Sequence, residues 1–466
     1  MKAWPPILLA ILAGCTVGPD YHRPDTPAVE VFRETPQGWK EAQPRDDIER
    51  GKWWEMFGDA QLNGLVEKID VSNQTLAGSE AQYRQALAAL GISRAALYPT
   101  LDANATAVRS HSPGSTLGGT TAGRTLTSYG GRLTSQWELD LWGRVRRSVE
   151  AAEAAARAST ADVGAARLSL QAQLATSYFQ LRSLDAQARL LDDTAGALRK
   201  SLELTENRYR AGVVARADVV QADAQLKSTL VQTIDLGVQR AQLEHSIAVL
   251  TGVPPSALAI ESVRSFDIDV PAIPPGLPSA LLERRPDVAA AERRVHASNA
   301  QIGVAKAAYF PQITLTAIFG FTSPDVSILF TGPSRQWSIG PSIAQSIFDA
   351  GLRRSQTEQA IAAYDATVAN YRQVTLTAFQ EVEDNLAALR ILEEEARSEE
   401  EAVQAARLSL SLVLNQYKAG TVSFLNVVTA QTALLNEERN AVGIQARRLA
   451  AVVALIRALG GGWHES

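Results

Sequence analysis

The stretch "QYKAGTVSFLNVVTAQ", residues 416–431, interrupts a long helix-forming region at a single glycine and then returns to a helical pattern. An earlier stretch, "RYRAGVVARADVVQAD" at residues 208–223, contains the same interruption. Gly212 and Gly420 are 420 − 212 = 208 residues apart, and Tyr, Ala and Val recur around them at the same offset. Because glycine tolerates the left-handed conformation that ends many helices, the sequence predicts a two-fold internal repeat in which each half reverses direction at its glycine.

Each glycine follows a long stretch that permits uninterrupted helix. Residues 144–253 and 342–466 contain no proline. Apolar residues in both stretches alternate spacings of three and four, as in a coiled-coil seam. Residues 144–209 and 352–417 are both 66 residues long, which corresponds to about 100 Å of helix at ~1.5 Å per residue. Each half is therefore predicted to be a helical hairpin.

Between the helical stretches the apolar pattern changes to strict alternation. It does so in "LDANATAV" (101–108), "LTSQWELDL" (133–141), "QITLTAIF" (312–319) and "QWSIGPSI" (336–343). A period of two predicts strands with one apolar and one polar face, two in each repeat. Four strands are too few to close on themselves, so a lipid-facing apolar side requires several chains to pool their strands in one barrel. A small soluble sheet packed on the helices is the alternative.

The N-terminus "MKAWPPILLAILAGC" predicts a signal peptide at residues 1–14, because the charged Lys2, an apolar run and the small residues Ala13 and Gly14 follow one another. The apolar run is too short to span a bilayer. Cys15 is the single cysteine of the chain, so no internal disulfide can form. Residues 12–15 resemble the bacterial lipobox, which implies cleavage before Cys15 and its acylation. Several acyl chains anchor a protein firmly. An ordinary secretory signal with an incidental cysteine is the alternative.

Composition and motifs argue against catalysis and nucleic-acid binding. The formal net charge of −5 leaves no basic footprint for nucleic acid. The five histidines are scattered without metal-ligand spacing, and neither a nucleophile motif nor a phosphate-binding glycine loop is found. We therefore expect no enzyme activity, no catalytic or metal site, and no cofactor apart from the covalent lipid on Cys15.

Four pieces of the sequence together resemble the TolC/OprM-type outer membrane factors, in particular their lipoprotein (NodT-like) branch. The resemblance runs from residue 14 into the last helix. Its pieces are "GCTVGPDYHRP" from Gly14, "WWEMFGDAQLNGLVE" from Trp53, "RRPDVAAAERRVHASNAQIGVAKAAYFPQITL" from Arg284, and the two glycine tips.

The resemblance implies a mostly α-helical fold with a membrane β part. Three copies would form a long antiparallel α-helical coiled-coil barrel, and the four strands of each copy would contribute to a twelve-stranded β-barrel in the outer membrane. Short helices at 73–97 and 279–308 would continue the returning helices at 218–250 and 426–459. The implied location is the outer membrane of a Gram-negative bacterium, with the lipid-anchored protein extending into the periplasm.

The predicted domain organisation follows the repeat. It consists of a signal peptide (1–14), a lipidated N-terminal and equatorial segment (15–72), a first repeat (73–252, tip at 210–214), a proline-rich equatorial linker (253–278), a second repeat (279–460, tip at 418–422) and a C-terminal tail (461–466).

The resemblance also implies two functional surfaces. A periplasmic adaptor would dock at the tips, on Ala211, Gly212, Val213, Ala419, Gly420 and Thr421. Where relatives often present a ring of aspartates at the threefold axis, this chain has Asn426 and Thr429. Phe424 and Leu425 stand beside them, and Asp218 of the first repeat is the nearby acid. We therefore expect a hydrophobic periplasmic gate.

The predicted function is that of a passive duct, the outer membrane component of a tripartite efflux system that exports drugs or other toxic small molecules. Its partners would be a periplasmic adaptor and an inner-membrane transporter. The alternatives are a duct for type I protein secretion and a non-conducting coiled-coil envelope lipoprotein.

Overall fold

The computed structural model describes residues 16–25, 33, 50–112, 124–263, 266, 268–271 and 285–461. The predicted signal peptide and Cys15 lie outside the described residues, so the anchoring prediction is not addressed by the fold. None of the described helices is both long enough and apolar enough to cross a membrane.

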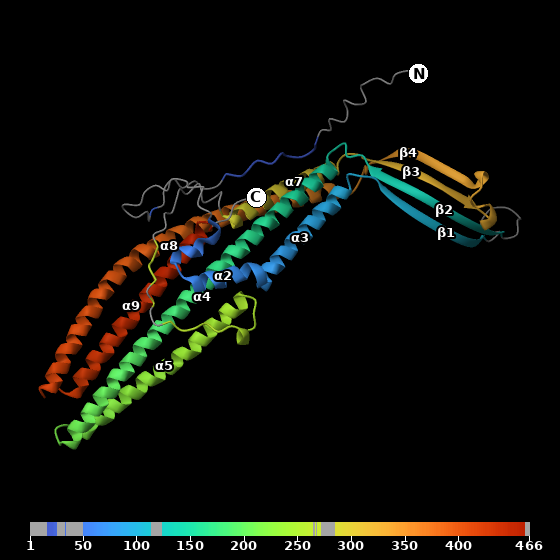
Figure 1. Ribbon diagram of the computed structural model, residues 1–466. Helices are drawn as coiled ribbons and strands as arrows, with labels where there is room; N and C mark the ends of the chain where they lie inside the picture. The colour runs from blue at the N-terminus through green and yellow to red at the C-terminus, as the bar shows by residue number, and fades with distance from the viewer. Residues whose placement is uncertain are drawn as a thin grey trace. The chain divides into compact units, whose positions relative to one another are not determined.

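Two pairs of long helices dominate the structure (Figure 1). Helices α4 and α8 have 67 residues each, and the returning helices α5 and α9 have 35 residues each. The equal lengths agree with the internal repeat. The bounds are α4 Arg144–Arg210, α5 Arg216–Leu250, α8 Leu352–Lys418 and α9 Phe424–Ala458.

The remaining elements are short helices and four strands. The α-helices are α2 Ala60–Ser72, α3 Gln74–Ala95 and α7 Pro286–Ala307, and the 3₁₀ helices are η1 Arg50–Phe57, η3 Pro255–Ala257, η4 Val326–Ile328 and η5 Gly332–Ser334. The strands are β1 Thr100–Ser112, β2 Arg124–Glu138, β3 Gln312–Ser323 and β4 Arg335–Ala344.

Two predicted boundaries were wrong for local reasons. The strand expected to reach residue 141 ends at Glu138, because Asp140 instead caps α4: its carboxylate accepts the N–H groups of Val145 at 2.9 Å and Arg146 at 2.8 Å. The helix expected to include Arg285 begins at Pro286, since proline fits the first helical position.

The four strands form one antiparallel sheet in the order β1-β2-β3-β4. Its register places Leu133, Phe319 and Trp337 side by side on one face. Thr134, Ile318 and Ser338 lie side by side on the other. Strands β1 and β4 are the two edges, and each pairs with one neighbour only among the described residues.

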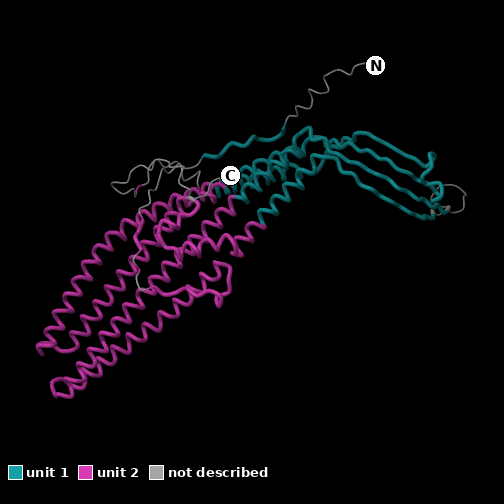
Figure 2. Tube along the Cα trace, in the orientation of Figure 1, with its two compact units in different colours: residues 1–25, 82–160, 290–371 teal, residues 26–81, 161–289, 372–466 magenta. Residues whose placement is uncertain are grey.

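The chain divides into two compact units (Figure 2). Unit 1 comprises residues 1–25, 82–160 and 290–371, and unit 2 comprises residues 26–81, 161–289 and 372–466. Each unit draws on both sequence repeats. Domain boundaries that follow the repeat therefore do not coincide with the compact units, and the repeat boundaries stay a prediction.

Buried apolar clusters join helices α4, α5 and α9 in unit 2. Leu191 of α4, Leu236 of α5 and Leu435 of α9 form one buried cluster. Leu198 of α4 and Leu226 of α5 belong to a second. Full burial of each leucine contributes roughly 1.5–3 kcal/mol. These side chains recur at the coiled-coil spacing, so the seam expected from the sequence packs the two hairpins of unit 2 against each other.

Arg285, which precedes α7, joins three parts of unit 2. Its side chain is 8% exposed and forms an ion pair with Asp287 at 2.7 Å and with Glu381 of α8 at 2.7 Å. It also donates to the carbonyl oxygen of Ala458 at the end of α9, at 3.1 Å. The Arg-Pro-Asp motif therefore fixes the start of α7 to α8 and α9.

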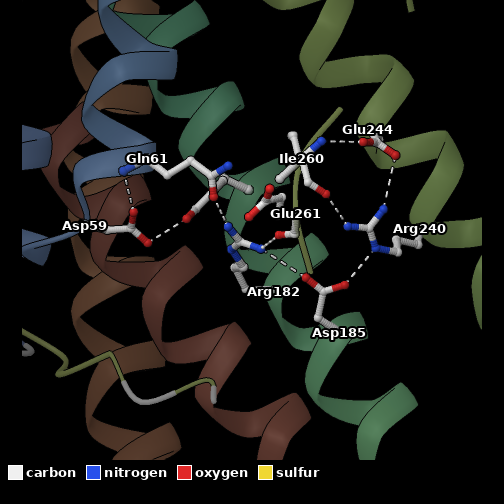
Figure 3. A network of polar contacts seen from close by, with 9 residues as sticks. Asp59, Gln61, Arg182, Asp185, Arg240, Glu244, Ile260 and Glu261 are labelled. Atoms are coloured by element: carbon white, nitrogen blue, oxygen red, sulfur yellow. Dashed lines mark hydrogen bonds and ion pairs between the residues drawn. The ribbon is translucent and has the colours of Figure 1, made fainter. Parts of the chain in front are cut away.

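A second buried polar network, centred on Asp185 of α4, holds the linker segment after α5 (Figure 3). The Asp185 side chain is 1% exposed and accepts from Arg182 at 3.0 Å and from Arg240 of α5 at 2.7 Å. These arginines also donate to the carbonyl oxygens of Glu261 at 2.7 Å and Ile260 at 2.6 Å. One carboxylate thus compensates two guanidinium groups that position the linker backbone.

The same network extends to neighbouring elements of unit 2 (Figure 3). The Ile260 N–H donates to Glu244 at 2.6 Å, and Glu244 pairs with Arg240 at 3.1 Å. Arg182 also donates to Gln61 at the start of α2. Asp59, which caps α2, accepts from Tyr178 of α4 at 2.6 Å. α2, α4, α5 and the linker are therefore connected by satisfied polar contacts.

We expect Asp185→Leu to destabilise the protein by about 3–5 kcal/mol, because it leaves the buried Arg182 and the half-buried Arg240 without their shared carboxylate. Thermal unfolding of the purified protein measures the loss. Asp193→Asn is the matched control on the same helix, since Asp193 pairs with Arg189 at 3.7 Å but is 74% exposed, and exposed pairs contribute only about 0–1 kcal/mol. Equal losses for both variants would contradict a stabilising role of the network.

Candidate functional site

The two hairpin tips adopt the left-handed conformation expected of their glycines. Gly212 has φ +75° and Gly420 has φ +78°. At the first tip, the N–H groups of Gly212 and Val213 donate to the carbonyl oxygens of Tyr209 and Arg208, at 2.8 and 2.9 Å. The second tip repeats both hydrogen bonds at 3.0 Å. This pattern is the Schellman motif, which satisfies the last carbonyl groups of a helix and reverses the chain.

All six predicted docking residues are exposed at the tips. Val213 is 61% exposed. A Cβ built on Gly212 meets nothing within 4 Å, and one built on Gly420 reaches only the Nη2 atom of Arg208 at 3.9 Å. Both glycines are therefore required by their backbone conformation and not by packing within the chain. The space around them is open to a partner.

Arg208 links the two tips, and the sequence analysis did not identify this role. Its guanidinium donates to the carbonyl oxygen of Tyr417 at 2.8 Å and lies 4.8 Å from the centre of the Tyr417 ring. Tyr417 is 4% exposed, whereas its repeat equivalent Tyr209 is 44% exposed. The sequence contains one signal of this role, which is a difference between the repeats. Gln416 occupies the position that corresponds to Arg208.

The predicted gate residues do not share one surface. Phe424 is 1% exposed and belongs to a buried cluster with Val427 and Val428. Its ring contacts the Tyr417 ring edge to face, with ring centroids 5.5 Å apart. Phe424 therefore does not lie on the exposed face of α9, and its contribution to a gate stays a prediction. Its helical spacing to Val427 and Val428 places it on the buried face of α9.

The other gate residues of α9 are brought together on its exposed face. Leu425 is 53% exposed, and Asn426 and Thr429 are also exposed. The Thr429 hydroxyl donates to the Leu425 carbonyl oxygen of the same helix at 3.0 Å. Asp218 lies in the first turn of α5 and is half-buried. The exposed set on α9 therefore consists of one leucine and two uncharged polar side chains.

The sheet presents a largely apolar face of exposed side chains. Trp337 is 71% exposed, Ile339 65% and Phe319 48%, and the register places all three on the same face. The opposite face carries Thr316 and Ser338, with Ile318 among them. Alternation along the strands therefore separates the two faces, as the sequence predicted.

Residues 16–25 form a strap on unit 1 that directly follows Cys15 in the chain. The Val17 N–H donates to the Trp142 carbonyl oxygen at 3.1 Å. Gly18 has φ +111° and lies on Gly303 so closely that an added Cβ would come within 2.5 Å of the Gly303 Cα. Arg147, which is 6% exposed, pairs with Asp20 at 2.9 Å. Small residues and a buried arginine thus fix this segment.

Tyr21 completes the strap. Its ring stacks on His296 of α7 with centroids 4.3 Å apart, and its hydroxyl donates to Glu292. Burial, followed by this hydrogen bond to Glu292, raises the pKa of the Tyr21 hydroxyl. The hydroxyl therefore remains a proton donor at neutral pH. The motif "GCTVGPDYHRP" was identified in the sequence, but the helices to which it binds were not.

Comparison with known proteins is consistent with these features. A family described as "Outer membrane efflux protein" matches residues 65–253 and 277–461, one segment in each half of the chain. The antibiotic efflux pump outer membrane protein ArpC of Pseudomonas putida is 34% identical over 463 residues, covering 98% of this chain and 94% of ArpC. OprJ of Pseudomonas aeruginosa is 32% identical over 461 residues, covering 98% of this chain and 95% of OprJ.

Solved structures agree with the sequence comparison. The outer-membrane channel OprN is 34% identical, with a TM-score of 0.89 over 96% of this chain and all of OprN (100%). The open state of the MtrE channel of Neisseria gonorrhoeae is 29% identical, with a TM-score of 0.83 over 97% of this chain and 99% of MtrE. The matched halves, the paired helical hairpins and the four-stranded sheet show that this chain belongs to the outer membrane efflux protein family and is an efflux channel of the outer membrane.

Proposed function

We propose that this protein is a homotrimeric, lipid-anchored and passive duct that exports toxic small molecules as the outer membrane part of a tripartite pump. The observation that carries the proposal is the sheet: one face is largely apolar and exposed, the other largely polar, and β1 and β4 leave two edges free among the described residues. In lipid, unpaired strand edges are too costly to persist. Pairing β4 of one copy with β1 of the next removes both edges and closes a barrel with a water-filled interior.

Exposed apolar positions on the long helices support the same assembly. Val220, Val231, Ile234 and Val238 of α5 are each at least 58% exposed. Their spacings of 11, 3 and 4 residues place them along one side of the helix. Such a stripe on a single chain indicates an interface. A neighbouring copy would cover it and continue the wall of helices.

The names of relatives support a small organic cargo. One relative in Pseudomonas putida is a toluene efflux pump outer membrane protein, and another belongs to an antibiotic efflux pump. The duct proposed here supplies no energy of its own. An inner-membrane transporter supplies the energy, and a periplasmic adaptor connects that transporter to the tips around Gly212 and Gly420.

The proposed anchor is the acylated Cys15, which becomes the first residue of the mature protein. The strap supports this proposal because it fixes the residues that directly follow Cys15 to unit 1. Mass spectrometry of the N-terminal peptide should show a chain that begins at an acylated Cys15. An unmodified Cys15, or an intact Met1, would remove the lipid anchor from the proposal and leave the duct unaffected.

Single-channel recording tests the duct and its gate together. The purified trimer should conduct, and Leu425→Ser should increase its conductance. The reason is that three leucines packed at the axis stabilise the closed state by roughly 1.5–3 kcal/mol each. Asp218→Asn should mainly change ion selectivity. A protein that never conducts in any variant is an envelope spacer, whereas opening by Asp218→Asn but not by Leu425→Ser indicates an electrostatic gate.

The docking proposal is tested by Gly420→Trp. We expect this variant to lose export in cells while it still assembles as a trimer, because the indole occupies the open space beside the tip. Gly420→Asn is the control, since asparagine adopts the left-handed conformation more readily than most residues and adds little bulk. Full export by the tryptophan variant would reduce Gly420 to a helix cap.

A further inference from the structure

The loop between β3 and β4 presents apolar side chains to its surroundings. Val326 is 57% exposed, Ile328 45% and Phe330 78%. This loop connects the end of β3 to the start of β4. The other end of β3 follows α7, and the other end of β4 precedes α8. In the barrel proposed above, the helices extend into the periplasm, so that proposal places the loop at the outer surface of the membrane.

Polar contacts within the loop hold this arrangement in place. Asp325 accepts the Ser327 N–H at 2.8 Å, and its own carbonyl oxygen accepts the Ser323 hydroxyl at 2.6 Å. Thr331 and Ser334 donate to the Ile328 carbonyl oxygen at 2.7 and 2.8 Å. The backbone groups of Asp325, Ser327 and Ile328 are thus hydrogen-bonded within the loop, and the apolar side chains remain exposed.

These side chains continue the apolar face of the sheet. The rings of Phe330 and Phe321 meet edge to face with centroids 5.5 Å apart, and the centroids of the Phe321 and Phe319 rings are 5.8 Å apart. Phe319 is directly opposite Trp337 in the register. The result is a row of aromatic rings that runs from the strands into the loop. Aromatic girdles of this kind mark the interfaces of β-barrels with the membrane surface.

A positive charge adjoins this row. Arg335 is opposite Phe321 in the register and two residues before Trp337, so it lies on the same face. Arg335 is exposed, and no ion pair of the described residues includes it. We define the rim surface as Val326, Ile328, Phe330 and Arg335. It combines apolar side chains with one uncompensated guanidinium.

We propose that the rim surface binds the phosphorylated head group of an anionic glycolipid in the outer leaflet. This inference rests on the proposed barrel, whose apolar face contacts lipid. Phe330 and its apolar neighbours insert at the boundary between acyl chains and head groups, and Arg335 pairs with the phosphate. A guanidinium matches a phosphate with two parallel hydrogen bonds, which gives it an advantage over other cations at such a site.

Native mass spectrometry of the trimer with bisphosphorylated lipid A tests the proposal. Arg335→Gln should weaken the apparent affinity about tenfold, as expected for the loss of a charge-assisted contact. Phe330→Ser should weaken binding of both bisphosphorylated and dephosphorylated lipid A. Arg132→Gln is the matched control, because Arg132 is an exposed arginine in register with Gly320, on the opposite face of the sheet.

Four results would overturn the proposal. They are unchanged affinity in Arg335→Gln, an equal loss in Arg132→Gln, equal binding of dephosphorylated lipid A to the unaltered protein, and equal binding of inorganic phosphate alone. Dissociation of the trimer by Phe330→Ser would show instead that the loop contacts another copy. A trimer that conducts normally but fails these binding tests would leave the duct intact and remove only the lipid site.

Discussion

The structure depends on one constraint, which is that the sheet of a single chain has two unlike faces and two open edges. An exposed row that includes Phe319, Trp337 and Ile339 is unfavourable in water, and unpaired strand edges are unfavourable in lipid. Both problems disappear only when copies of the chain share their strands.

The two repeats share their glycine tips, but the residues around the tips differ in identity and in burial. Tyr417 is buried under Arg208, and Phe424 fills the core beside it, while Tyr209 stays exposed and Arg216 occupies the position equivalent to Phe424. One tip is therefore fixed by contacts from the other half of the chain. The exposed face of α9 follows from this asymmetry, since burial of Phe424 leaves Leu425, Asn426 and Thr429 on the opposite side.

Polar networks hold the linker after α5, the start of α7 and the strap at the N-terminus. Arg182, Asp185 and Arg240 fix the linker after α5, and Arg285 fixes the start of α7. Near the N-terminus, Asp20 and Tyr21 hold the strap to unit 1. In the networks around Asp185 and Arg285, the buried charged side chains have hydrogen-bond partners, whereas the Nε atom of Arg147 under the strap is buried without one. Buried charges that are paired in this way specify where irregular segments lie.

Sequence by itself determined the features that repeat along the chain. The glycine tips, the paired long helices, the four alternating strands and the family all follow from spacing and motif, because period and backbone conformation are local properties. Tertiary structure decided which copies of a repeated residue are buried. An Arg182–Asp185 pair three residues apart resembles any surface pair on a helix, and Phe424 resembles its neighbour Leu425. Only the packing of distant helices distinguishes them, because burial depends on what lies opposite in space.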